Sequence, residues 1–410
     1  KYHARETALE VAELYGASVV LGSATPSLEA YYRAGRGEYR LFQLTKRLTG
    51  GELPTVYTVD LRQELQEGNR SIFSRKLQEL MTDRLNKGQQ TILFLNRRGY
   101  AGFVSCRSCG EVMKCPHCDV SLSEHKGGRL ICHYCGYTQP MPKLCPKCGS
   151  KYILGFKAGT QQIEEKLKEL YPGVRTLRMD ADTTRTKDSY EKILSSFANG
   201  EADVLIGTQM IVKGHDFPKV TLVGILAADL SLNASDYRAG ERTFQLLTQA
   251  VGRAGRGALP GEAVIQTYQP DHYAITCAAA QDYESFYQEE ILYREMSGYP
   301  PVAHMLAVQI YGKEEENVKQ LALRLTDVVK SNMDFLSGKQ KEQSNKKIQV
   351  LGPAPANISK INDIYRYVFY VKHAEYDVLV EVKDRLEETL RQWQPRQMSI
   401  QFDFDPVSVL

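Results

Sequence analysis

Residues 106–148 have the sequence CRSCGEVMKCPHCDVSLSEHKGGRLICHYCGYTQPMPKLCPKC and contain eight of the nine cysteines of this 410-residue chain. The eight form four Cys-x-x-Cys pairs: Cys106/Cys109, Cys115/Cys118, Cys132/Cys135 and Cys145/Cys148. Two residues between thiolates allow a tight turn to aim both sulfurs at one metal ion, and two such turns complete the four-thiolate tetrahedron that zinc prefers. Eight ligands therefore predict two zinc sites.

The spacing also indicates which pairs share an ion. Only five residues separate Cys109 from Cys115, so the first two pairs would crowd a single metal, whereas the thirteen residues between Cys118 and Cys132 are a normal spacing for a zinc ribbon. We therefore expect a nested arrangement, with one ion on the inner pairs (Cys115, Cys118, Cys132, Cys135) and one on the outer pairs (Cys106, Cys109, Cys145, Cys148). The alternative is disulfides, which need an oxidising compartment. Because eight thiolates fill both sites, the nearby histidines are expected to pack or to face solvent (His117, His125, His133).

Bulk composition excludes a membrane protein and leaves several soluble classes open. The length suits two to four domains, and the net charge of +3 says little about partners. Residues 104–151 carry seven Lys/Arg against three Asp/Glu, a modest local excess of positive charge. No apolar run approaches the ~20 residues of a membrane span, and no signal-peptide pattern is present. We expect a cytoplasmic, nucleoid-associated protein. The chain starts at Lys1 within a helix-like pattern, so we also expect a fragment.

Strand and helix patterns alternate on both sides of the cysteine-rich stretch. Expected strands are 17–21, 91–95, 174–179, 204–208, 220–228 and 261–267, and expected helices are 4–15, 75–87, 161–170, 187–199, 238–249 and 272–298. Residues 46–74 are expected to form a linker with an extended piece at 55–60. This rhythm predicts an α/β fold, a parallel sheet covered on both faces, into which the zinc module is inserted. Cys277 is expected to be a buried core thiol.

The last part of the chain shows a different order. Strand 305–311, helix 314–335, strands 348–351 and 365–372, helix 376–393 and strand 399–405 give βαββαβ, a ferredoxin-like α+β order. The lysine-rich residues 339–347 are expected to form an exposed loop.

Three motifs lie at the ends of predicted strands: GSATPS (22–27), FLNRRGY (94–100) and GTQMIVKGHDFP (207–218). A fourth, QAVGRAGRG (249–257), lies between a predicted helix and the last strand of the sheet. Taken singly, the first is compatible with an ordinary turn and the second with a solvated basic turn. In this order they resemble the superfamily-2 helicases, whose motor is built from RecA-like lobes. The eight-cysteine insertion directly after FLNRRGY narrows the resemblance to the replication-restart helicases of the primosome, the PriA family.

The resemblance implies a division of the chain. Residues 1–45 would end the first, ATP-binding lobe, residues 46–103 and 151–298 would form the second lobe, 104–150 the zinc insertion and 299–410 the C-terminal domain. The chain departs from the family in lacking both a G-x-x-x-x-G-K-[ST] phosphate loop and a DEEH motif, which the family places before the point where this chain begins. We therefore expect this chain alone to be inactive as an ATPase.

The resemblance also assigns residue roles, listed here by role. Arg253 and Arg256 would contact the γ-phosphate, and their spacing would let both face the cleft from one helical turn. Gln249 would orient the same site. DNA contacts fall to Asn96, Arg97, Arg98, Thr208 and Gln209. Coupling to the nucleotide falls to Gly22, Ser23, Ala24, Thr25, Lys213, Gly214 and Asp216.

The implied activity is ATP-dependent 3′-to-5′ DNA unwinding at stalled or repaired forks, with two Zn²⁺ and with ATP and Mg²⁺ as cofactors. Implied partners are forks, D-loops and single-strand/duplex junctions, primosome proteins, the loader of the replicative helicase and single-strand binding protein. The zinc module has two candidate roles, a strand-separating wedge, in which Tyr134 and Tyr137 can stack on bases, or a docking surface. A duplex translocase without strand separation and a zinc-ribbon adaptor that uses no nucleotide are the alternative functions.

Overall fold

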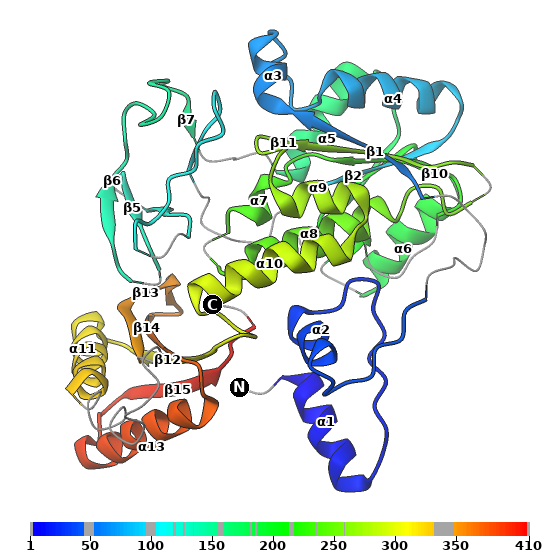
Figure 1. Ribbon diagram of the computed structural model, residues 1–410. Helices are drawn as coiled ribbons and strands as arrows, with labels where there is room; N and C mark the ends of the chain where they lie inside the picture. Colours follow the sequence, from blue (N-terminus) through cyan, green and yellow to red (C-terminus); the bar gives the residue numbers. More distant parts are fainter. Residues whose placement is uncertain are drawn as a thin grey trace.

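The computed structural model describes residues 3–44, 53–95, 104–117, 120–125, 128–133, 135–154, 159–180, 183–184, 187–212, 217–234, 236–257, 259–331 and 348–407. Figure 1 shows a large sheet with helices on both sides, a small cysteine-rich module beside it, and a second sheet that carries two helices. The predicted α/β fold with an inserted module and an α+β C-terminal part is confirmed. Among the described residues, no helix is long and apolar enough to cross a bilayer.

The large sheet has six strands in the order β1-β11-β10-β2-β9-β8, and every neighbouring pair is parallel. The strands are β1 (Thr55–Asp60), β2 (Gln90–Phe94), β8 (Thr176–Met179), β9 (Val204–Gly207), β10 (Val220–Ile225) and β11 (Glu262–Thr267). The central strands are buried along their whole length. Burial on both faces is why their sequences are continuous apolar runs rather than alternating ones.

Helices cover both faces of this sheet. Successive side chains of a strand point to opposite faces, so neighbouring residues pack under different helices. Leu93 packs in the core under α4 (Arg75–Asn86) and α5 (Thr160–Leu170). Its neighbours Ile92 and Phe94 pack in the opposite core, under α6 (Lys187–Ala198), α8 (Ala239–Val251) and α9 (Tyr273–Ala280). Each such fully buried side chain contributes about 1.5–3 kcal/mol through burial, so the two cores hold the helices firmly on the sheet.

One strand prediction is wrong in this region. Residues 17–21 form no strand, and Val20 is 91% exposed; the six strands of the sheet all come from residues 55–267, and none pairs with this segment. The extended piece predicted at 55–60 is β1, which completes the sheet, and an unpredicted helix, α3 (Leu61–Gln66), follows it. Residues 272–298 are helical as predicted, in two helices, α9 and α10 (Tyr283–Ser297), because Gln281 adopts a left-handed conformation between them.

The N-terminal helices lie beside this lobe. α1 (Ala4–Tyr15) forms as predicted but buries none of its residues. α2 (Leu28–Gly35), which the sequence patterns did not predict, is anchored by Leu28, whose side chain is fully buried in the core beneath α8.

The C-terminal sheet confirms the predicted βαββαβ order, with the strands in the order β13-β14-β12-β15, all antiparallel. Its elements are β12 (His304–Gly312), α11 (Glu315–Ser331), β13 (Gln349–Ile361), β14 (Ile364–His373), α13 (Tyr376–Trp393) and β15 (Met398–Phe404). One face packs on α11 and α13. The other face carries Met305, Ala307, Val368 and Tyr370, which pack in one cluster with residues of the cysteine-rich module. The predicted loop at 339–347 lies outside the described residues.

The cysteine-rich module is inserted between β2 and α5. Its two ends are joined by the short antiparallel pair β3 (Ser105–Cys106) and β7 (Ile153–Leu154). A three-stranded sheet lies within it, formed by β4 (Ser123–His125), β5 (Arg129–Ile131) and β6 (Thr138–Pro140).

Candidate functional site

The outer cysteines converge at the base of the inserted module. The sulfurs of Cys106, Cys109, Cys145 and Cys148 all lie within 4.8 Å of one another. The Sγ atoms of Cys106 and Cys148 are 3.6 Å apart, as are those of Cys109 and Cys145. Four thiolates around a zinc ion, with Zn–S bonds of 2.3 Å, would lie about 3.8 Å apart. The spacing therefore fits a four-thiolate zinc site, and the predicted zinc-binding chemistry of the module is supported.

The inner cysteines form a second group. The sulfurs of Cys115, Cys132 and Cys135 lie within 4.8 Å of one another, and Cys118, the expected fourth ligand, lies outside the described residues. Burial raises the pKa of the Cys115 thiol to about 12, so a thiolate at this position needs a positive partner such as a metal ion. The described sulfurs are grouped as the nested arrangement requires. No disulfide joins any cysteine in the described part of the chain.

The local backbone explains why each pair makes a turn. In three pairs a glycine follows the second cysteine and has a positive φ: Gly110, Gly136 and Gly149. The N–H of each of these glycines donates to the carbonyl of the first cysteine of its pair, at 2.8–2.9 Å. Only glycine adopts this conformation at little cost, so the sequence Cys-x-x-Cys-Gly itself specifies the turn that points both sulfurs to one side.

The histidines pack beside these sites. The ring of His117 packs edge-on against Tyr137. His133 Nδ1 lies 3.0 Å from the Pro355 carbonyl oxygen, which can only accept, so this nitrogen donates and Nε2 accepts from His125 Nε2 at 3.1 Å. Burial lowers the pKa of His133 to about 4, which keeps the ring neutral in this chain of hydrogen bonds. Neither His125 nor His133 joins a cysteine group among the described residues.

The segment after residue 21 is held by its own hydrogen bonds and by α10. Ser23 Oγ accepts from the Thr25 backbone N–H at 3.1 Å, and Thr25 is buried. The Tyr283 hydroxyl donates to the Pro26 carbonyl at 3.0 Å. Ser27 begins α2 by accepting from the Ala30 N–H. The GSATPS motif is thus fixed against the large lobe, with Gly22 and Ala24 inside this turn.

The loop after β9 starts at the carboxyl end of the sheet. Thr208 donates its backbone N–H to Met179 at 3.3 Å, and Gln209 begins the short 3-10 helix η1 (Gln209–Val212). The proposed coupling residues Lys213, Gly214 and Asp216, like Asn96, Arg97 and Arg98 of the FLNRRGY motif and Tyr134 of the module, lie outside the described residues.

The QAVGRAGRG motif differs from the expected geometry in one respect. α8 ends at Val251, two residues before Arg253, so Arg253 and Arg256 lie in the following turn and not on one helical turn. The chain turns because Gly255 has a φ of +68°. Gln249 and Arg256 are exposed, and Arg256 Nε donates to the Gly252 carbonyl at 2.8 Å.

Two of the motifs meet at the amino end of β10. The Gly255 N–H donates to the Val220 carbonyl at 3.0 Å. A Cβ on Gly257 would lie 2.5 Å from the Pro218 carbonyl oxygen, so only glycine allows this approach. The end of the GTQMIVKGHDFP loop and the arginine turn are therefore in direct contact.

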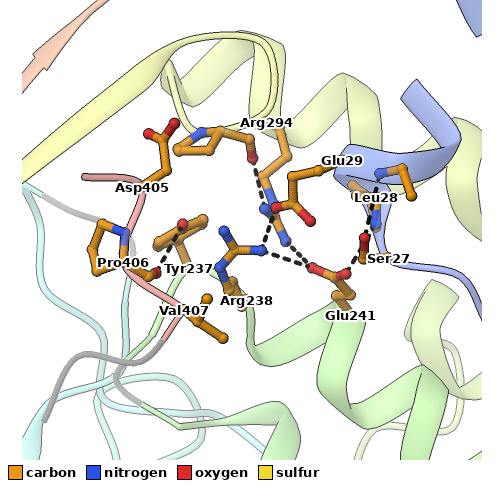
Figure 2. Close-up of polar contacts among 12 residues, drawn as sticks. Ser27, Leu28, Glu29, Tyr237, Arg238, Glu241, Arg294, Asp405, Pro406 and Val407 are labelled. Atoms are coloured by element: carbon orange, nitrogen blue, oxygen red, sulfur yellow. Dashed lines mark hydrogen bonds and ion pairs between the residues drawn. The ribbon is translucent and has the colours of Figure 1, made fainter. Parts of the chain in front are cut away.

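A buried charge cluster was missed by sequence reasoning (Figure 2). Arg238 pairs with Glu29 and lies 3.5 Å from Glu241, and Arg294 lies 3.2 Å from Glu241 and 2.7 Å from Glu290. The available signal was Arg238/Glu241 at i, i+3 and Glu290/Arg294 at i, i+4, charged pairs at helical spacing. Such pairs usually face solvent, so the pattern did not indicate burial.

Comparisons with known proteins agree along the whole chain. A family model described as the primosomal protein N C-terminal domain matches residues 295–407, one described as the PriA DNA helicase Cys-rich region matches 115–140, and one described as the helicase conserved C-terminal domain matches 144–258. The chain is 44% identical to the replication restart protein PriA of Bacillus subtilis, covering 100% of the chain and 50% of that protein. The identity is 42% to the protein of the same name from Synechocystis (100% and 48% covered) and 40% to that of Chlamydia pneumoniae (99% and 53%). The chain spans about half the length of these relatives.

Proposed function

Since this chain belongs to the PriA family of replication restart proteins, we propose that it forms the second motor lobe, zinc module and C-terminal domain of an ATP-dependent DNA helicase. The proposed division is 1–45 for the end of the first lobe, 46–103 and 151–298 for the second lobe, 104–150 for the module and 299–410 for the C-terminal domain. The helicase would unwind DNA in the 3′-to-5′ direction at stalled or repaired forks and direct reloading of the replicative helicase.

The observation that carries the proposal is the contact between the loop that ends at Pro218 and the turn that holds the two arginines. The Gly257 backbone packs on Pro218, and Gly255 is hydrogen-bonded to Val220. A motor needs its nucleotide contacts and its DNA contacts on one mechanically continuous element. In this proposal the 207–218 loop, which starts after β9 and ends before β10, would supply that continuity.

In this proposal Arg253 and Arg256 stabilise the charge that develops on the γ-phosphate of ATP, and Gln249 orients the same site. Both lie in the turn beyond α8, where Arg256 is exposed and Arg253 is half-buried, and they would face a nucleotide held mainly by the first lobe, together with Mg²⁺. ATP would supply the free energy for closing and reopening the cleft between the lobes.

DNA contacts are proposed for Thr208 and Gln209 and for Asn96, Arg97 and Arg98. Lys213, Gly214 and Asp216 would couple these contacts to the nucleotide, and Gly22, Ser23, Ala24 and Thr25 would sense its state from the first-lobe side. Contacts of this kind are made mainly to phosphates and carry no base sequence, so binding is expected to depend on DNA structure and on salt.

The zinc module is proposed to hold two Zn²⁺ in closed four-thiolate sites, which are structural rather than catalytic. Proposed partners are primosome proteins, the helicase loader and single-strand binding protein, in the cytoplasm at the nucleoid. Whether the module separates strands or docks partners is decided by the strand-displacement arm of the following experiment.

The test is ATP turnover and strand displacement on a forked DNA by the full-length protein that contains this chain. Arg256→Ala is expected to lower DNA-stimulated ATP turnover by about 10³-fold, because the transition-state charge loses a cation, while DNA binding is retained. Arg175→Ala is the control, since Arg175 is an exposed arginine of the same lobe that pairs with Asp203.

Unchanged turnover in the Arg256→Ala protein would overturn the assignment and favour an adaptor that uses no nucleotide. Turnover without strand displacement in the unmodified protein would indicate a duplex translocase. In a third sample, Cys115→Ser and Cys118→Ser are combined. Loss of unwinding with retained ATP turnover would identify the module as the wedge.

A further inference from the structure

The two ends of α8 lie next to two different motifs. Its amino end carries Glu241, whose Oε1 accepts from the Leu28 backbone N–H at 3.0 Å, directly after GSATPS. Its carboxyl end carries Gln249 and leads into Arg253 and Arg256. Thirteen helical residues span about 20 Å, so one straight element links the first-lobe segment to the arginine turn.

The amino-end contact is buried and ionic (Figure 2). The Arg238 side chain is 8% exposed and bridges Glu29 and Glu241. Arg294, fully buried on α10, approaches Glu241 from the other side at 3.2 Å and also donates to the Pro300 carbonyl at 2.8 Å. The segment that follows GSATPS is therefore held by charges, which are directional, and not only by the apolar side chain of Leu28.

The cluster combines three carboxylates with several guanidiniums. Glu29, Glu241 and Glu290 face Arg238 and Arg294, and Arg5 on α1 approaches Glu29 at 3.9 Å. Although burial alone would raise it, Arg238 lowers the pKa of Glu29 to about 2. Burial and the nearby Glu29 carboxylate raise the pKa of Glu241. Glu29 therefore stays ionised beside Arg238. If Glu29 moved away, Arg238 would form its ion pair with Glu241 instead.

The carboxyl half of α8 is fixed in the core. Leu247, Ala250 and Val251 are fully buried against the sheet, and Gly255 is bonded to β10. Both halves of α8 pack on the same core, so the contacts at its amino end help to set the orientation of the whole helix and with it the position of the arginine turn.

We propose that Glu29, Arg238 and Glu241 are positioning residues that couple the GSATPS segment, through α8, to the turn that carries Arg253 and Arg256. The inference rests on the proposed function and adds the route by which the two motifs communicate. The residues touch no nucleotide themselves. They set the position of the arginines when DNA is bound.

The test compares variants of the full-length protein by steady-state ATP hydrolysis with and without a single-stranded oligothymidylate, beside thermal unfolding. Glu29→Gln removes the charge and keeps the shape. It is expected to lower the DNA-stimulated kcat by about ten- to hundredfold, with the KM for ATP and the affinity for the oligothymidylate unchanged, because positioning is lost in the transition state rather than in binding.

Glu38→Gln is the matched control. Glu38 lies in the same N-terminal segment, where it pairs with Arg36 at 3.4 Å, but its side chain is half exposed and it forms no ion pair with the cluster among the described residues. Tyr283→Phe is a milder second variant, which removes only the hydroxyl bond to Pro26 and no charge. It is expected to lower the stimulated kcat severalfold in the same direction at temperatures where the protein is fully folded.

A kcat in Glu29→Gln and Tyr283→Phe equal to that of Glu38→Gln, below the unfolding temperature of each protein, would overturn the coupling and leave the cluster a packing feature. Arg256→Ala separates this failure from failure of the proposed function. If Arg256→Ala abolishes turnover, the motor assignment stands whatever the Glu29 result. If it does not, the motor assignment itself fails.

Discussion

Asp229, on the short helix α7 (Asp229–Leu232), gives a pH prediction at the scale of one residue. Burial raises its pKa from 3.8 to about 6, although its carboxylate accepts from the Thr267 hydroxyl at 2.9 Å and from the Tyr268 N–H. Because the folded state then binds more protons than the unfolded state between these values, the free energy of unfolding falls as pH rises toward 6. The fall between pH 5 and pH 7 is about 1 kcal/mol.

Asp229→Asn removes this titration. Urea unfolding at pH 5, 6 and 7 should therefore show the variant gaining about 1 kcal/mol relative to the unmodified protein over that range. Asp271→Asn, at an exposed carboxylate in the loop after β11, should show no such trend. A stability difference between Asp229→Asn and the unmodified protein that stays constant with pH would contradict the assignment.

At the residue scale, the metal-binding role of the cysteines could be predicted from the sequence, whereas the burial of the charged cluster could not. Cys-x-x-Cys spacing is local, and a glycine completes the turn after three of the four pairs, so the chemistry can be inferred from a few neighbouring residues. Glu29 and Arg238 are 209 residues apart, and a charged residue carries no periodic signal that reports its burial. Only the fold reveals that they meet.

At the scale of elements, the two cysteine groups predict independent metal sites. Cys145→Ser should lower the zinc content from about two ions per chain to about one, and Cys132→Ser should do the same for the other site, measured by elemental analysis after dialysis. The two groups share no ligand among the described residues.

Cys277→Ser is the matched control for zinc content, because Cys277 is a buried thiol on α9, outside both cysteine groups. Its zinc content should stay at two. About one zinc in the unmodified protein, or loss of both ions in either single variant, would contradict two independent sites.

Element prediction succeeded for the long, strongly periodic segments. Helices and strands of the large lobe follow their predicted ranges within about three residues, and α13 matches its predicted range. Residues 17–21 have the same apolar composition as a buried strand, yet they form none. A strand is stabilised by the ladder beside it, and composition alone does not report whether that neighbour exists.

At the scale of the whole molecule, the cysteine-rich module contacts both sheets. Ser121 donates to the Asn233 carbonyl beside α7, and a Cβ on Gly110 would lie 2.6 Å from the Tyr268 carbonyl oxygen at the end of β11. On its other side, His133 is bonded to Pro355 of β13. These contacts use backbone carbonyls far away in the chain, which any residue supplies, so no sequence pattern predicts them. The packing follows from the fold, whereas the order of the parts could be predicted.

Tyr299 lies where the C-terminal sheet meets the lobe of the six-stranded sheet and gives the last prediction. Its ring stacks on Tyr237 with centroids 4.7 Å apart, and Lys372 Nζ lies 4.2 Å from its centroid. Both rings are buried, and the Tyr237 hydroxyl donates to Pro406 at 3.4 Å. Tyr299→Ala should lower the free energy of unfolding by about 3–5 kcal/mol. The contacts that it removes are those between the two parts and not those within either core. Calorimetry of the 410-residue chain should then resolve two transitions in place of one. Tyr376→Ala, a partly exposed tyrosine that packs only against His304 and Phe404, should shift a single transition slightly. A single, merely lowered transition in Tyr299→Ala would show that this junction does not join the two parts, since the sheets would then still unfold together without it.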